Sequence, residues 1–145
     1  MATIAIARPH GRLGGNLSTA LRWERILTSL GHRVSVEEGW TPSAAPAPDL
    51  LIALHARRSA TAIEAFTAAH PDGALIVAAT GTDLYVDLPA GGAQGLASLP
   101  GFELADRILV LQELAAAALP EGLLHKTRVI HQSAQGLPAT HGAPP

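Results

Sequence analysis

Residues 8–33 read RPHGRLGGNLSTALRWERILTSLGHR, and this stretch decides the fold. It follows a short apolar run that holds Ile4 and Ile6, and it continues into a segment with apolar residues at helical spacing. The glycines between them let the backbone turn tightly and approach a ligand closely, because glycine has no Cβ. A strand, a glycine-rich turn and a helix in this order are typical of the first unit of a nucleotide-binding type of α/β domain.

The helix predicted after the glycines closes on Gly31. The first turn of a helix carries backbone N–H groups without intrahelical partners, together with a partial positive charge. We therefore expect Gly14, Gly15 and Asn16 to contact a bound anion or a sugar hydroxyl. A tight connection without a ligand is the alternative, because GRLGGN lacks the full G-x-G-x-x-G spacing.

Apolar runs of strand length recur along the chain, at residues 3–7, 33–37, 50–54, 75–79, 108–111 and 128–130. Segments with helical spacing lie between several of them, and one of these has Ser59 as a predicted N-cap and Pro71 as a predicted stop. Strands that alternate with helices through short connections predict an α/β fold. We expect a Rossmann-like parallel sheet of about six strands with helices on both faces.

The chain divides into a single predicted domain and a tail. Residues 1–132 have the length and composition of one Rossmann-like domain, whereas residues 133–145 have the Pro, Gly and Ala content of a linker. A linker at this place indicates one half of a two-domain architecture, cut or terminated where the second half would begin. An apolar face left by the missing half would favour a homo-oligomer.

Composition excludes several classes of partner. The net charge is −2 and no basic cluster is present, which argues against nucleic acid. There is no cysteine, so a thiolate nucleophile or a disulfide framework is impossible. No apolar run approaches the ~20 residues of a membrane span and no basic segment precedes one, so we expect a cytoplasmic protein without a membrane partner. The histidines outside the site below lack metal-ligand spacing, and we expect no metal and no cofactor.

Ligands of open α/β sheets collect beyond the carboxyl ends of the strands. The residues that we expect there, besides the glycine turn with Arg12, are His55, Arg57, Arg58, Thr80, Gly81, Thr82, Asp83, Tyr85, Gln112, His131, Gln132 and Ser133. Arginine's planar fork suits phosphate or carboxylate oxygens, so the predicted ligand is a small anion.

Several of these residues have a structural interpretation beside the functional one. His55 ends the run DLLIALH, so it is either a site residue at the sheet edge or a buried histidine bonded to backbone. Asp83 either organises a turn or accepts hydrogen bonds from sugar hydroxyls. Arg57 and Arg58 are adjacent, and one of them is expected to be surface only. Trp23 and Trp40 are expected to pack in the core and a loop.

The segments GNLSTALRW, LHARRSA and TGTDLY, taken together and in this order, resemble the N-terminal half of bacterial glycosyltransferases of the GT-B, family 4 type. Within that family the resemblance is to the selenosugar-forming enzymes of selenoneine biosynthesis, and it runs over residues 4–134. It implies transfer of N-acetylglucosamine from a UDP-sugar to selenophosphate. It also implies that this domain presents the acceptor while a C-terminal domain grips the donor.

The same resemblance suggests roles for the site residues. His55 and Asp83 are the expected catalytic residues, and the glycine turn, Arg57, Arg58, Thr80, Gly81, Thr82 and Tyr85 are expected to bind substrate. Family 4 enzymes often have a histidine where this chain has Thr80, and an Asn-Gly pair in place of Gln132 and Ser133, which indicates a specialised acceptor. The acidic donor-site motif has no counterpart here, so the isolated chain is expected to be inactive.

Two other functions fit the sequence. One is a glycosyltransferase half with a carbon-based acceptor. The other is a non-catalytic nucleotide-binding module, since Glu37 follows the second strand about where a dinucleotide-binding domain keeps its ribose-binding acid.

Overall fold

The protein is described by a computed structural model that covers residues 1–11, 14–43 and 47–133. Within these residues, six parallel strands form one sheet in the order β2-β1-β3-β4-β5-β6. The strands are β1 (Thr3–Arg8), β2 (Arg33–Glu38), β3 (Leu50–Leu54), β4 (Ala74–Ala78), β5 (Arg107–Val110) and β6 (Thr127–Val129). The predicted α/β, Rossmann-like class is confirmed, and each strand ends within one residue of its predicted bounds.

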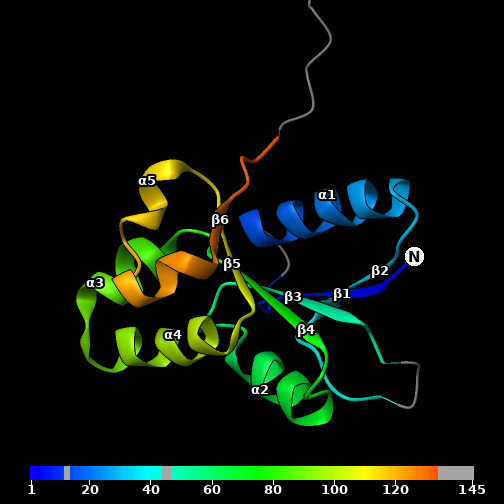
Figure 1. Cartoon of the computed structure of the whole chain (residues 1–145), viewed down its shortest axis with the longest axis horizontal. Coiled ribbons are helices and arrows are strands. Elements are labelled where there is room, and N and C mark those ends of the chain that lie inside the picture. The colour runs from blue at the N-terminus through cyan, green and yellow to red at the C-terminus, as the bar shows by residue number, and fades with distance from the viewer. Residues whose placement is uncertain (12–13, 44–46, 134–145) are drawn as a thin grey trace, which may run out of the picture.

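Helices cover both faces of this sheet (Figure 1). The α-helices are α1 (Gly15–Ser29), α2 (Ala60–Ala69), α3 (Leu88–Ala90), α4 (Gly92–Leu104) and α5 (Glu113–Ala116). A π-helical turn, η1 (Asp83–Asp87), precedes α3, and a 3-10 segment, η2 (Glu121–Lys126), leads into β6. α1 lies alone on one face, while α2 and α4 pack on the other.

The core follows the alternation of side chains along the strands. On β1, Ile4 and Ile6 face α1, whereas Ala5 and Ala7 face the α2 and α4 side. Trp40 packs edge-on against Phe66, with ring centroids 5.3 Å apart. Trp23 packs against the apolar cluster beneath α1, so the structural interpretation of both tryptophans is confirmed.

α4 is an element that the sequence did not predict, because its segment contains several glycines and Pro100, which have low helix propensity. The small residues serve packing instead. A Cβ at Gly101 would lie 3.3 Å from the Ala56 carbonyl oxygen and 3.1 Å from Ile63, so glycine lets α4 approach this closely without a shift of its neighbours. Lys126 Nζ donates to the carbonyls of Glu103 and Ala105 at 2.7 and 2.8 Å, which caps the carboxyl end of α4.

The predicted start and stop of α2 are confirmed, although the N-cap side chain bonds elsewhere. Ser59 is the N-cap residue and the helix ends just before Pro71, yet no side-chain capping bond forms. The Ser59 hydroxyl donates instead to the Leu54 carbonyl at 2.7 Å, which ties the start of α2 to the end of β3. No helix in the described part of the chain has the length and apolar character needed to cross a bilayer.

Candidate functional site

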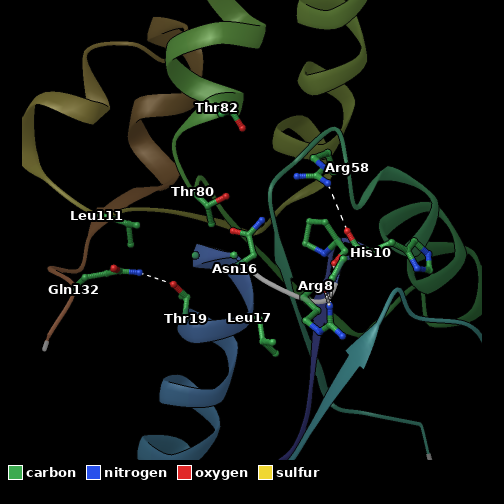
Figure 2. A pocket seen from close by; sticks show the side chains of 14 residues that line it. Arg8, His10, Asn16, Leu17, Thr19, Arg58, Thr80, Thr82, Leu111 and Gln132 are labelled. Carbon is green, nitrogen blue, oxygen red and sulfur yellow. Dashed lines mark hydrogen bonds between the residues drawn. The ribbon is translucent and has the colours of Figure 1, made fainter. Parts of the chain in front are cut away.

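A pocket of about 330 Å³ lies at the carboxyl edge of the sheet, beside the first turn of α1 (Figure 2). Strand order reverses between β1 and β3, and the residues that follow β1, β3, β4 and β6 all reach this pocket. Its lining consists of Arg8, Pro9, His10, Gly11, Gly14, Gly15, Asn16, Leu17, Thr19, Arg58, Thr80, Thr82, Leu111 and Gln132. The predicted meeting of strand ends at one rim is thus observed for part of the predicted set.

The glycine turn brings the amino end of α1 to the pocket. Gly14 is the N-cap residue, and its φ is 152°. Residues other than glycine rarely adopt this backbone conformation. No side-chain capping bond forms at this end within the described residues. The first-turn N–H groups of Gly15 and Asn16 therefore lack an intrahelical acceptor at a place where a ligand can supply one. Arg12 lies outside the described residues.

Glu38, the last residue of β2, holds the other end of the glycine turn. Its carboxylate accepts from the Gly11 N–H at 2.7 Å and pairs with Arg8 at 3.2 Å and His10 at 3.4 Å. The Gly11 hydrogen bond is the main reason why the pKa of Glu38 is lowered. Arg8 also donates to the Gly11 carbonyl at 2.8 Å. Side chains thus hold both the N–H and the carbonyl group of Gly11 in the turn.

Glu37, the candidate ribose-binding acid, lies in a different hollow. It lines a neighbouring pocket of about 350 Å³, which shares Arg8, His10 and Arg58 with the first one. The hydroxyl of Ser35 donates to Glu37 at 2.9 Å. The acid that contacts the glycine turn is therefore Glu38, and it holds the protein backbone.

The two adjacent arginines point in different directions. Arg58 is exposed and lines the pocket, where its guanidinium lies 3.5 Å from the His10 carbonyl oxygen. Arg57 turns away to form two hydrogen bonds with Asp87, at 2.8 and 3.2 Å. This bonding raises the pKa of Arg57. The expected pair of guanidinium groups is thus split, and of the two only Arg58 lines the pocket.

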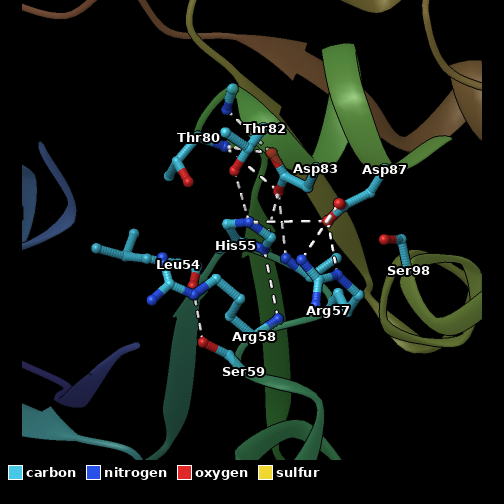
Figure 3. Close-up of polar contacts among 12 residues, drawn as sticks. Leu54, His55, Arg57, Arg58, Ser59, Thr80, Thr82, Asp83, Asp87 and Ser98 are labelled. Carbon is cyan, nitrogen blue, oxygen red and sulfur yellow. Dashed lines mark hydrogen bonds and ion pairs between the residues drawn. The ribbon is translucent and has the colours of Figure 1, made fainter. Parts of the chain in front are cut away.

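Asp83 organises the turn after β4. Its fully buried carboxylate accepts from the backbone N–H groups of Thr80 and Gly81, both at 3.0 Å, and from that of Ala56 at 3.2 Å (Figure 3). The structure thus supplies the turn-forming contacts of the first interpretation. A direct contact of Asp83 with substrate stays a prediction.

Thr80 and Thr82 line the main pocket, and the remaining residues of this turn do not. Gly81 and Tyr85 line a smaller hollow of about 120 Å³ next to it. The Tyr85 hydroxyl accepts from the Gln112 side chain at 2.7 Å. Of the substrate-binding residues predicted after β4, the structure therefore brings the two threonines to the anion pocket.

His55 lies beneath the turn after β4 and has only 1% of its surface exposed (Figure 3). Its Nε2 is 2.8 Å from the Thr82 hydroxyl, and its Nδ1 accepts from the Arg58 N–H at 3.4 Å. Asp87 and Asp83 lie 3.9 and 4.0 Å from the ring nitrogens. Burial nevertheless lowers the pKa of His55, because loss of hydration outweighs the attraction of the two carboxylates. His55 does not line the pocket, and its catalytic role stays a prediction.

Six residues of the pocket lining were not among those expected at the rim, namely Arg8, Pro9, His10, Leu17, Thr19 and Leu111. Gln132 donates from Nε2 to the Thr19 hydroxyl at 2.6 Å, which joins the segment after β6 to α1. Gln132 was expected at this rim because it follows a strand, and it does line the pocket. Arg8 still belongs to β1 and Thr19 lies inside a helix, and nothing in their local sequence marks them.

The lining offers donors to an anion and, among the described residues, contains no carboxylate. The donors are the Arg58 guanidinium, the amino end of α1, the Asn16 amide and the threonine hydroxyls. Within the same residues no group of three or more His, Asp or Glu side chains could hold a metal ion. A scan against models of known protein families finds no match, and a search of the curated proteins finds no similar one.

Proposed function

We propose that this chain is the acceptor-side domain of a GT-B glycosyltransferase and that its pocket binds a small phosphate-like oxyanion. The observation that carries the proposal is the pocket itself. Among the described residues, its lining joins a helix N-terminus that has no side-chain cap with Arg58 and two threonines, and it includes no carboxylate that would repel an anion.

The reaction proposed for the complete enzyme comes from the resemblance of GNLSTALRW, LHARRSA and TGTDLY to the selenosugar-forming glycosyltransferases. Selenium of selenophosphate attacks C1 of N-acetylglucosamine, the bond from C1 to the UDP oxygen breaks, and UDP leaves. Water then cleaves the P–Se bond, which releases phosphate and the selenosugar. The role of this domain is to hold the anionic nucleophile in line, while a donor-binding domain stabilises the departing diphosphate.

Titration with inorganic phosphate tests the anion site, with amide chemical shifts of Gly14, Gly15 and Asn16 as the readout. Arg58→Ala should weaken phosphate binding at least tenfold. The substitution removes a guanidinium that lines the pocket and that the sequence had predicted to bind substrate. Arg33→Ala is the matched control, since Arg33 is exposed at the opposite end of the strands and should leave the affinity unchanged. Equal losses in both variants, or shifts scattered over the whole surface, would remove the site.

Competition for the phosphate site distinguishes the proposed function from the two alternatives, a carbon-based acceptor and a nucleotide-binding module. Displacement of phosphate by selenophosphate supports the anionic acceptor, whereas displacement by neutral sugars favours a carbon-based acceptor. Binding of NAD with shifts at Glu37 would favour the nucleotide-binding module. The glycosyltransferase part is tested by assaying this domain together with a GT-B donor-binding domain for selenosugar formation from UDP-N-acetylglucosamine and selenophosphate.

A further inference from the structure

His55 has an unusual backbone for its residue type. Its φ is +71°, and among the described residues it is the one non-glycine residue with a positive φ. This conformation costs conformational energy and tends to persist where the surrounding structure uses it. Here it turns the chain between β3 and α2 and places the imidazole ring beside Thr82, behind the lining of the anion pocket (Figure 3).

The contacts of the ring determine which nitrogen carries the proton. Nδ1 faces the backbone N–H of Arg58, which can only donate, so Nδ1 must be an acceptor. The lowered pKa of His55 keeps the ring neutral, and a neutral ring has one proton. That proton is therefore on Nε2, and Nε2 donates it to the Thr82 hydroxyl oxygen 2.8 Å away.

The neighbouring carboxylates do not compete with Thr82 for the proton on His55 Nε2. Asp83 is occupied by three backbone N–H groups, and Asp87 is held by the two hydrogen bonds from Arg57. The Thr82 oxygen thus accepts from His55, and its single hydrogen must point away from the ring. Figure 2 shows the hydroxyl end of Thr82 directed toward the pocket that it lines. For a ligand in this pocket, Thr82 is a donor.

We infer that Thr82 is a specificity-determining donor for the oxyanion and that His55 is the positioning residue that fixes the direction of its hydroxyl. This inference rests on the proposed function, because it concerns the ligand of the same pocket. If Thr82 donates to the ligand, the ligand atom next to Thr82 must be a hydrogen-bond acceptor. An unprotonated oxygen of a phosphate-like anion is such an atom. A group that can only donate, such as an ammonium, cannot use the Thr82 hydrogen and finds one of the two oxygen lone pairs already taken by His55, so it is disfavoured.

Phosphate binding by the full chain tests the role of Thr82. Thr82→Val keeps the shape of the side chain and removes the hydroxyl, so it should weaken phosphate binding at least fivefold. Thr82→Ser keeps the hydroxyl above His55 and should bind phosphate within twofold of the unaltered chain. Equal affinities of the Val and Ser variants would overturn the inference and leave the proposed function standing. Failure of the unaltered chain to bind phosphate would remove both.

The ring of His55 gives a second readout that requires no variant. The ¹⁵N shifts of its two ring nitrogens distinguish a proton on Nε2 from one on Nδ1, and we expect Nε2 at neutral pH. A proton on Nδ1, or on both nitrogens, would overturn the positioning role. In addition, His55→Asn should weaken phosphate binding in the otherwise unaltered chain but add no further loss to Thr82→Val, because His55 acts through Thr82. Additive losses would contradict this order of action.

Discussion

Two turns at the carboxyl edge of the sheet line the same pocket but are held in place by opposite means. We call residues 8–11 and 14–16 the glycine loop and residues 80–83 the threonine loop. The glycine loop is held by Glu38, whose side chain is 42% exposed and which pairs with Arg8 and His10. The threonine loop is held by the carboxylate of Asp83, which is fully buried, and rests on a buried histidine.

The difference follows from where each carboxylate lies. A charge pair at the surface is weakened by water and salt, so we expect the glycine loop to adjust its amides to an incoming ligand. Hydrogen bonds to a buried carboxylate cannot be replaced by water, so the threonine loop keeps its geometry whether or not a ligand is present. The pocket thus combines an adaptable wall with a preorganised one. Three experiments test this comparison.

The largest effect is expected from removing the carboxylate of the threonine loop. Asp83→Ala leaves three backbone N–H groups without their acceptor, including that of the buried Ala56, and should lower the free energy of unfolding by roughly 3 kcal/mol or more. Urea denaturation measures the change. Asp72→Ala, the same substitution at an exposed turn residue, is the control and should change the value by less than about 0.5 kcal/mol. A similar, small effect at both positions would end the distinction between the loops.

An intermediate effect is expected from the ionisation of His55. Its folded pKa lies below the ordinary value of 6.5, so the unfolded chain takes up the proton first as the pH falls. The contribution of His55 to stability is therefore complete above pH 6.5 and is lost as the pH falls from there toward the folded pKa. The slope from this one group is at most about 1.4 kcal/mol per pH unit.

His55→Asn removes this proton uptake and keeps a residue type that tolerates positive φ, so the variant should lose less stability than the unaltered chain between pH 7 and pH 5. Urea unfolding at a series of pH values gives the two slopes. His125→Asn, at an exposed position, is the matched control and should keep the slope of the unaltered chain. Identical slopes for all three proteins would mean that His55 does not have a lowered pKa.

The smallest effect is expected from neutralising the carboxylate of the glycine loop. Glu38→Gln keeps an oxygen that can accept from Gly11 but loses the charge that attracts Arg8. The thermal midpoint should fall slightly at low salt, and the difference from the unaltered chain should vanish near 1 M salt, where the screening length is only about 3 Å. Glu64→Gln on the outside of α2 is the control. A loss as large as that of Asp83→Ala, or one that salt leaves unchanged, would show that the two loops are held alike.

The sequence predicted the strands well because the central ones are buried on both faces and therefore read as uninterrupted apolar runs. It missed α4, since glycines and a proline lower helix propensity and their value becomes visible only against Ala56 and Ile63. It could not separate Arg57 from Arg58. The two are neighbours in the chain, and only the position of Asp87 on η1 decides that the first turns away from the pocket.

By itself, the sequence determined the fold class, the edge of the sheet where polar residues gather and the glycine turn that opens α1. These features follow from local composition and periodicity, which the chain carries along its length. The tertiary structure alone decided which residues share the pocket, which carboxylate holds backbone and which nitrogen of His55 faces Thr82. Such choices depend on burial and on partners distant in the chain, as in the contact between Gln132 and Thr19. A hydrogen bond is specified only once both of its ends have been brought together.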